Sequence, residues 1–154
     1  MRVLCDTNVL ARAATRPGGP AQEVLRRLIA SPGHVLIATP FLLGELTRVL
    51  GYARIKLRAA ATDEEIAAFL DELEGVAEIA TPPDAAPAVV GDPADDAVLA
   101  GCIAGRVEVL CTRDRHFHRP TVLALCAAQG IRILDELSLL AELRASKSSS
   151  EASD

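Results

Sequence analysis

Residues 3–8 read VLCDTN: three apolar residues are followed at once by an acid, a hydroxyl and an amide. The apolar run predicts a short buried strand at residues 3–5, and residues 7–14 suit a helix. In an open parallel sheet, sites form beyond the carboxyl ends of the strands, at the point where the strand order reverses. Asp6 is therefore expected at an edge of the sheet where a site forms.

The rest of the chain alternates strand patterns with helix patterns. Further strands are predicted at residues 35–38, 76–80, 107–111 and 131–134. Helices are predicted to begin at Pro20, Pro40, the Thr62–Glu65 capping box, Pro93, Pro120 and the cap Asp135, the last ending near Arg144. A parallel crossover needs a dozen or more residues, so this alternation predicts a three-layer α/β/α sandwich around a central parallel sheet. Residues 146–154 are expected to be a disordered C-terminal tail.

The composition indicates one soluble domain. The chain of 154 residues suffices for a single core, and its four cysteines lie in apolar surroundings without a C-x-x-C motif. We expect buried free thiols in a reducing cytoplasm and no membrane span, since the apolar runs are too short. The net charge of −5 argues against a general polyanion binder, although Arg48, Arg113 and Arg115 lie in local basic runs that could hold phosphates. Ordinary solvated arginines explain the charge pattern equally well.

Two further acids are predicted to join Asp6. Asp114 follows the strand pattern VEVLCT, so it reaches the same edge of the sheet as Asp6. Glu45 lies on one helical stripe with Leu42 and Leu46, on a face that should pack inward. A lone buried carboxylate is costly unless a cation neutralises it. Because Glu45 lies in mid-helix and has no capping role, its position favours a site.

The helix that follows Asp92 offers another acid in two ways. Helical phase puts Asp95 on the inward face with Val98 and Ile103, and it puts Asp96 at the edge of that face. For Asp95 alone, a place in the first turn near the positive end of the helix dipole is an equally good explanation. Asp92 fits the role of N-cap only. Phase favours Asp95 over Asp96, and both stay candidates.

Converging carboxylates predict a hard divalent cation, because like charges brought together without one repel. Oxygen-only ligands favour Mg²⁺ or Mn²⁺. Such an ion supports hydrolysis of a phosphodiester bond, because it activates water and offsets charge on the phosphoryl group. Asn8 and Thr112 could orient the carboxylates through hydrogen bonds, although a helix cap or a turn explains Thr112 equally well. The residues leave open whether one ion binds or two.

The segments LCDTNVL, LGEL, DPADDAVLA and CTRDRHF resemble, in order and spacing, the signature segments of the PIN domain. The resemblance looks closest to VapC-like toxins of toxin–antitoxin pairs, and it extends to about residue 143. It implies a nuclease domain over residues 1–145 that uses Mg²⁺ or Mn²⁺ to cleave single-stranded RNA. It also implies a homodimer and, for a toxin, inhibition by a small antitoxin protein.

The resemblance also assigns individual residues. The acidic quartet of the family corresponds to Asp6, Glu45, Asp95 and Asp114. Asn8 and Thr112 match its supporting polar positions, and some branches would align Asp96 in place of Asp95. Many members have a further acid where this chain has His116, which leaves the number of metal ions open. From position alone, His116 and His118 could bind phosphate or be solvated turn residues.

The leading hypothesis is therefore a metal-dependent endoribonuclease. Its metal ions are expected to be bound by Asp6, Asp95 and Asp114, with Glu45 completing the site and nearby arginines holding the RNA backbone. The alternative is a non-catalytic RNA-binding or scaffold module on the same fold, and the presence of all four acids favours the enzyme. Two other phosphate-handling classes fit less well. A phosphatase of the haloacid dehalogenase type would need an aspartate at the position of Asn8, and a dinucleotide binder would need G-x-G-x-x-G after the first strand.

Overall fold

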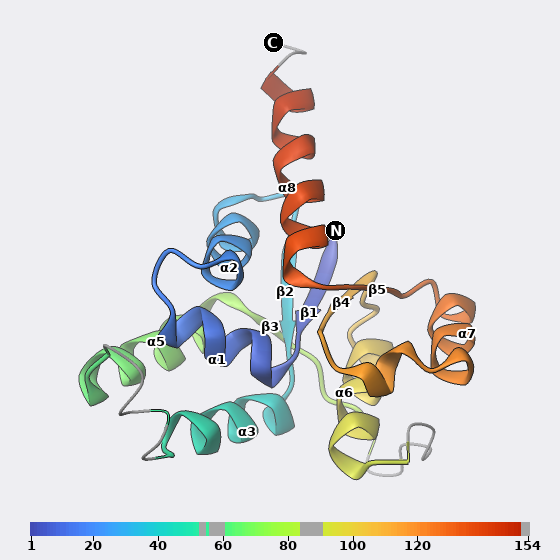
Figure 1. Ribbon diagram of the computed structural model, residues 1–154, viewed down its shortest axis with the longest axis horizontal. Helices are drawn as coiled ribbons and strands as arrows, with labels where there is room; N and C mark the ends of the chain where they lie inside the picture. The colour runs from blue at the N-terminus through green and yellow to red at the C-terminus, as the bar shows by residue number, and fades with distance from the viewer. Residues whose placement is uncertain (53–54, 56–60, 84–90, 152–154) are drawn as a thin grey trace.

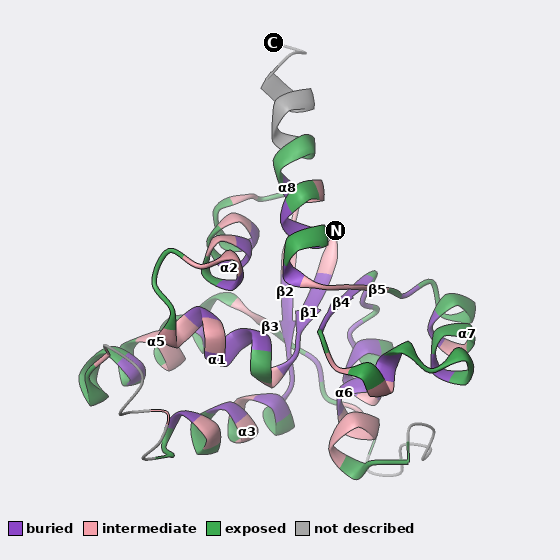
Figure 2. Ribbon diagram, in the orientation of Figure 1, coloured by how far each residue is buried: buried purple, intermediate pink, exposed green. Residues whose placement is uncertain are grey.

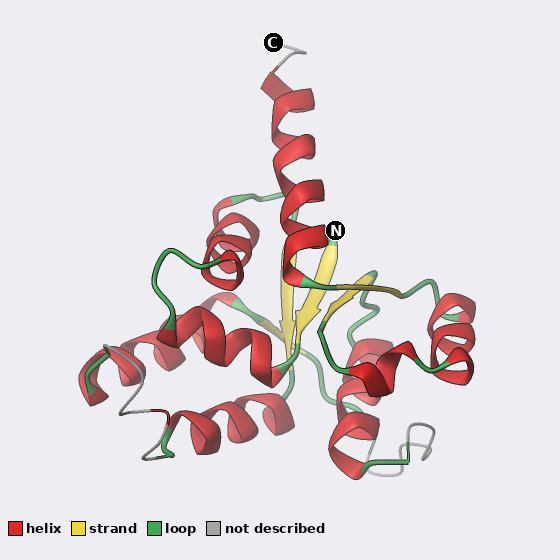
Figure 3. Ribbon diagram, in the orientation of Figure 1, coloured by secondary structure: helices red, strands yellow, loops and turns green. Residues whose placement is uncertain are grey.

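The computed structural model describes residues 1–52, 55, 61–83 and 91–151. The strands are β1 Arg2–Cys5, β2 Val35–Ala38, β3 Glu78–Ile79, β4 Val109–Cys111 and β5 Arg132–Leu134. The helices are α1 Thr7–Thr15, α2 Pro20–Ala30, α3 Pro40–Leu50, α5 Asp63–Val76, α6 Pro93–Ala104, α7 Pro120–Ala128 and α8 Glu136–Glu151, with a 3₁₀ helix η1 at Arg115–His118. Helices α1, α2, α3 and α5 lie on one side of the sheet, and α6 and α7 lie on the other (Figures 1 and 3). The predicted α/β/α sandwich is confirmed.

All the strand pairs are parallel, in the order β3-β2-β1-β4-β5. The chain adds β2 and β3 on one side of β1 and then returns to add β4 and β5 on the other, so the strand order reverses between β1 and β4. Residues 3–5 pair in register with residues 109–111, and none of the six is more than 1% exposed (Figure 2). Burial on both faces explains why both strands are continuous apolar runs.

Several predicted boundaries differ from the observed ones. β3 covers only residues 78–79 because α5 continues through Gly75 to Val76, and β4 begins at Val109 rather than at residue 107. Ile103 was expected to face inward and is 40% exposed. The reason is that Gly101, rather than Ile103, lies against the sheet. Residues 81–93, TPPDAAPAVVGDP, are predicted by composition to form a loop, and they fall largely outside the described residues.

The end of the last helix is corrected as well. The sequence predicted that it stops near Arg144, but α8 continues to Glu151. Residues 145–151 contain no glycine or proline, and serine has only a modest helix penalty, so nothing local ends the helix earlier. Residues 152–154 of the predicted tail lie outside the described residues. Asp135 caps this helix as predicted, because its Oδ1 accepts a hydrogen bond from the Ser138 N–H at 2.7 Å.

Two predictions from composition can be compared with the structure. All four cysteines are buried free thiols, as expected from their apolar surroundings. Within the part of the chain that the structure describes, none of the helices has the length and apolar character needed to cross a lipid bilayer.

Helix α6 packs against the sheet through glycine. A Cβ atom added to Gly101 would lie 2.6 Å from Cγ2 of Thr39 and 3.6 Å from Cδ1 of Leu4. Thr39 cannot easily rotate away, because its Oγ1 accepts the hydrogen bond from the Leu42 N–H that caps α3. The backbone of α6 at Gly101 therefore packs directly against the side chains of Leu4 in β1 and Thr39 at the start of α3. This contact fixes the position of α6, which carries Asp95 in its first turn.

Replacement of Gly101 by alanine tests this contact. We expect Gly101→Ala to lower the free energy of unfolding by about 1–3 kcal/mol, because the added methyl group overpacks the interface. Gly44→Ala is the matched control: it also replaces a helical glycine, but no heavy atom lies within 4 Å of the new Cβ. It should raise the free energy of unfolding by roughly 0.5–1 kcal/mol. Urea denaturation measures both, and a stabilising Gly101→Ala would contradict the close packing.

A buried acid connects three elements at the carboxyl edge of the sheet. Glu136, the first residue of α8, is 0% exposed; its Oε1 lies 2.7 Å from Nε of Arg12 in α1, and its Oε2 lies 2.6 Å from Nε of Arg113 after β4. The Arg113 contact is ionic, because Oε2 has no partner in hydrogen-bond geometry. Burial alone would raise the pKa of Glu136, but its backbone hydrogen bond and the two guanidinium groups outweigh burial and lower it.

The lowered pKa predicts how stability depends on pH. The folded protein holds Glu136 ionised at pH values where the unfolded chain takes up a proton, so this contribution is complete above the ordinary glutamate pKa of about 4.3 and disappears as pH falls through the folded value. We expect Glu136→Gln to cost about 2 kcal/mol at pH 7, since it leaves two arginines without their partner. Denaturant melts should show the difference shrinking below about pH 4. A difference that does not depend on pH would contradict the ionic role.

Candidate metal centre

Asp6 lies one residue beyond β1, at the point where the strand order reverses. Its carboxylate caps α1 by accepting a hydrogen bond from the Val9 N–H at 2.8 Å, and it also accepts one from the Thr112 hydroxyl. Its own N–H donates to the Cys111 carbonyl at 3.1 Å. The residue is only 6% exposed, and burial raises the pKa of Asp6 despite these hydrogen bonds. Asp6 is thus held rigidly, in surroundings that favour a neutral acid or a bound cation.

Asp114 follows β4 and is joined to Asp6 through one hydroxyl group. The Thr112 hydroxyl that donates to Asp6 also accepts a hydrogen bond from the Asp114 N–H at 3.0 Å. The Asp114 carboxylate accepts one from the His116 N–H at 2.9 Å, which starts η1. The structure therefore places Thr112, predicted as a supporting residue, between the two acids that end neighbouring strands.

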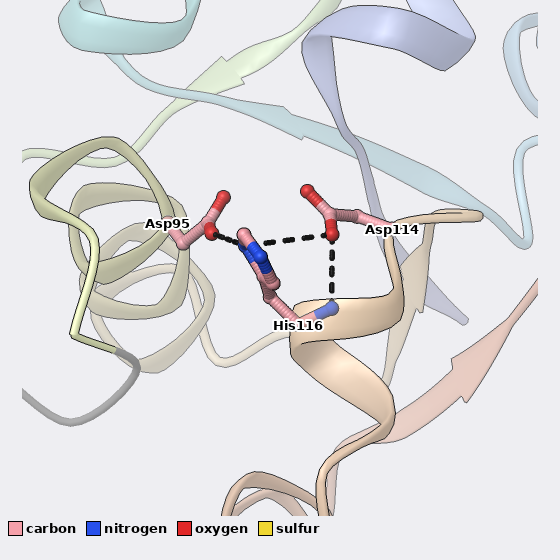
Figure 4. Close-up of side chains that lie close together, drawn as sticks. All are labelled: Asp95, Asp114 and His116. Atoms are coloured by element: carbon pink, nitrogen blue, oxygen red, sulfur yellow. Dashed lines mark hydrogen bonds and ion pairs between the residues drawn. The ribbon is translucent and has the colours of Figure 1, made fainter.

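Asp95 reaches the same place from the first turn of α6. Its Oδ2 lies 2.7 Å from Nδ1 of His116, and that nitrogen lies 3.6 Å from Oδ1 of Asp114 (Figure 4). The three side chains each offer one ligand atom, and these atoms lie within 4.8 Å of one another. Burial raises the pKa of Asp95, and the charges of Asp114 and Asp92 raise it further. Asp92 instead caps α6, accepting from the Ala94 N–H at 2.8 Å.

All four predicted acids line one hollow of about 100 Å³. Its described lining comprises Asp6, Thr7, Asn8, Glu45, Val49, Ala94, Asp95, Val98, Asp114 and Phe117. Asn8 is exposed at its rim, and Asp96 is not among the described residues that line it. Larger hollows of about 410 and 480 Å³ border α2, but no group of acids converges in them. The hollow of about 100 Å³ is therefore the candidate site, because its described lining contains a group of acids.

The predicted arginines are less free than the charge pattern indicated. Arg48 is ion-paired with Glu45 and hydrogen-bonded to Tyr52, whereas Arg113 is paired with Glu136. Arg115 is exposed. Two of the three therefore balance acids of this chain, and Arg48 lies beside the hollow through its pairing with Glu45.

Sequence reasoning missed the partners Arg12 and Glu136. The missed signal was the same that identified Asp6: Glu136 also comes just after the carboxyl end of a strand, here β5. Arg12 offered no local signal, because an arginine near the end of a helix is common on the surface. It lies close enough to Asp6 for its charge to lower the pKa of that acid, against the effect of burial.

The hollow fits a divalent cation by the chemistry of its donors. Among the described residues, Glu45 is the one acid of the four that is ion-paired with an arginine. The partners of the other three are backbone N–H groups, the Thr112 hydroxyl and the ring of His116. Burial disfavours the charges of Asp6 and Asp95, so a cation that joins carboxylate oxygens would relieve a cost already present. Asp95 and Asp114 bring ligand atoms within 4.8 Å of one another and of His116, while Asp6 lines the same hollow but does not belong to that group.

Comparison with known proteins agrees with this geometry. A family model described as a PIN domain matches residues 2–116, which include the four acids and end at His116. No curated protein matches the chain.

Asp6→Asn separates charge from capping. Asparagine is as good an N-cap as aspartate, so the variant should keep α1 while removing a buried charge. In EDTA we expect its melting temperature to rise by roughly 2–4 °C, the shift for about 1 kcal/mol in a chain of this size. Added Mn²⁺ should stabilise the wild type and leave the variant nearly unchanged.

Asp92→Asn is the matched control, since it makes the same change at the N-cap of α6. It should retain the response to Mn²⁺. A strongly destabilised Asp6→Asn in EDTA would mean that Asp6 serves the fold rather than a cation.

Proposed function

This chain belongs to the PIN domain family, and from that membership and its converging carboxylates we propose that it is a metal-dependent endoribonuclease acting on single-stranded RNA. PIN domains are generally metal-dependent nucleases. The observation that carries the proposal is the arrival of Asp6, Glu45, Asp95 and Asp114 from four different elements in one small hollow. Acids at such separate chain positions meet there because β1 and β4 are neighbours at the point where strand order reverses.

The proposed chemistry is hydrolysis of a phosphodiester bond. Asp6, Asp95 and Asp114 would hold Mg²⁺ or Mn²⁺, which when bound activates water and offsets the charge of the phosphoryl group. Thr112 keeps Asp6 and Asp114 in place through its hydroxyl. Glu45 lines the hollow and is ion-paired with Arg48, and its carboxylate is the proposed acceptor for the proton of the attacking water.

Single-stranded RNA is proposed as the substrate from the resemblance of the chain to VapC-like members of the family. The hollow bears on the kind of contact instead, because at about 100 Å³ it admits a phosphate group rather than a base. The chain has three Phe, one Tyr and no Trp, which leaves little surface for base stacking and assigns the main contact to the backbone. Exposed Arg115 is the proposed phosphate contact, whereas Arg48 and Arg113 are ion-paired with Glu45 and Glu136.

The biological role follows from the resemblance of the four sequence segments to VapC-like toxins. We propose that the protein is the toxin of a toxin–antitoxin pair, that it forms a homodimer, and that an antitoxin protein inhibits it. Four buried free thiols are compatible with the reducing cytoplasm in which such pairs act.

Cleavage of labelled single-stranded RNA tests the activity. The wild type with Mn²⁺ or Mg²⁺ should cleave inside the strand, and Asp114→Asn should lower the rate by about a hundredfold or more, as expected for loss of a charge that stabilises the transition state. Asp71→Asn, an exposed acid on α5, should leave the rate unchanged. Binding of RNA by the wild type without cleavage in either metal would favour the non-catalytic RNA-binding module.

A further inference from the structure

We propose that His116 is a metal ligand and that its imidazole makes this centre prefer a transition-metal ion such as Mn²⁺ to Mg²⁺. The proposal rests on the metal-dependent function above and goes beyond it, because an oxygen-only set of ligands favours no such preference. The ring nitrogen Nδ1 of His116 would therefore determine the metal selectivity of the centre.

The position of Nδ1 is the first support. It lies 2.7 Å from Oδ2 of Asp95 and 3.6 Å from Oδ1 of Asp114. Metal–ligand bonds to nitrogen and oxygen are about 2.1 Å long, so two ligands of one ion lie no more than about 4 Å apart. Both distances meet this limit. The nitrogen therefore lies close enough to one oxygen of each carboxylate to share an ion with it (Figure 4).

The local backbone holds the ring there. Asp114 caps η1 by accepting a hydrogen bond from the His116 N–H at 2.9 Å, so the carboxylate and the imidazole belong to one turn. Phe117, the next residue, is 1% exposed and anchors that turn in the core. The ring contacts Asp95 across from α6, whose place is fixed by the contact of Gly101 with Thr39. An ion at the two acids would meet the imidazole without a change of fold.

The ring also contrasts with the other histidines. Nδ1 of His118 lies 3.0 Å from the backbone carbonyl of Asp114, and its side chain contacts no described carboxylate. His34 lies at the far side of the molecule, in the hollow between α2 and α8. Among the histidines of this chain, His116 is thus the one whose ring nitrogen faces a pair of acids.

Ligand chemistry turns this geometry into selectivity. Mg²⁺ is a hard ion that takes oxygen ligands and gives up its water reluctantly, so an imidazole adds little to its binding. Transition-metal ions accept imidazole nitrogen readily alongside carboxylate oxygen. The ring nitrogen of His116 is in hydrogen-bond contact with Asp95, and an ion that cannot replace this contact with a bond of its own to nitrogen is at a disadvantage.

The bland alternative is that His116 only orients Asp95. An orienting residue would improve the binding of every divalent ion to a similar extent, and its nitrogen would not be bonded to the ion. The ratio of the two affinities and a direct signal from nitrogen therefore distinguish a ligand from a positioning residue.

The experiment uses the full untagged chain, so that no tag histidine contributes. Mn²⁺ binding is measured from the EPR signal of the free ion, and Mg²⁺ binding is measured by competition. Pulsed EPR of the bound Mn²⁺ then detects coupling to ¹⁴N of imidazole. The variants are His116→Asn, which removes the imidazole, His116→Asp, which supplies an oxygen ligand in its place, and His118→Asn as the matched control; circular dichroism and thermal melts verify that each folds.

The expected results are specific to a nitrogen ligand. Wild type and His118→Asn should show the ¹⁴N coupling, and both His116 variants should lose it. The ratio of the Mg²⁺ to the Mn²⁺ dissociation constant should fall about tenfold or more in His116→Asp, because the added oxygen ligand strengthens Mg²⁺ binding relative to His116→Asn.

Two other outcomes overturn different statements. Tight Mn²⁺ binding by the wild type without ¹⁴N coupling, or an unchanged ratio in His116→Asp, would overturn the role of His116 and leave the nuclease proposal standing. If the wild type binds neither ion, the metal-dependent function itself is overturned.

Discussion

The parallel pairing of β1 with β4 is the constraint on which the site depends. The register continues one residue past the strands, since the Asp6 N–H donates to the Cys111 carbonyl. This places Asp6 beside Thr112, whose hydroxyl can then bond to Asp6 and to the Asp114 backbone together. Asp6 and Asp114, which lie more than a hundred residues apart in the sequence, are thereby held side by side at the carboxyl ends of β1 and β4. Glu45 and Asp95 complete the hollow because α3 and α6 pack beside this pair.

How much could be predicted depended on whether the cause was local. Apolar runs and caps sufficed for the sheet, for α3 and for α6, because strand and helix periods are written in neighbouring residues. Asp95 stayed ambiguous because the dipole of a helix and a cation both favour an acid in the first turn. The packing of α6 adds what the sequence lacks, since it brings Asp95 against His116 in the hollow while Asp92 caps the helix.

Long-range partners were beyond the sequence patterns. The ion pairs of Glu136 with Arg12 and Arg113 join residues from three elements, and no spacing along the chain announces them. From the sequence, Arg113 therefore looked available to bind phosphate. In the structure it is paired with the buried Glu136. The length of α8 was missed for a different reason: serine is only a weak stop signal, and residues 145–151 have no glycine or proline.

Two buried acids at one edge of the sheet play different roles, and their ion pairs distinguish them. Glu136 is fully buried and has two guanidinium groups beside it, so its pKa falls and its charge contributes to stability. Asp6 is almost as buried, and burial raises its pKa because the hydrogen bonds from Thr112 and Val9 and the charge of Arg12 offset burial only in part. The charge of Glu136 is thus balanced within the protein, whereas the charge of Asp6 is left for a bound ion to balance.

The Arg12–Glu136–Arg113 cluster bears on how the chain can be dissected. The family match ends at residue 116, so a fragment trimmed there would keep every acid of the hollow. It would also strand two guanidinium groups and strip away Leu139, Leu140 and Leu143 of α8, which are buried in the intact protein. The recognisable signature is thus shorter than the smallest autonomous folding unit, which must reach well into α8.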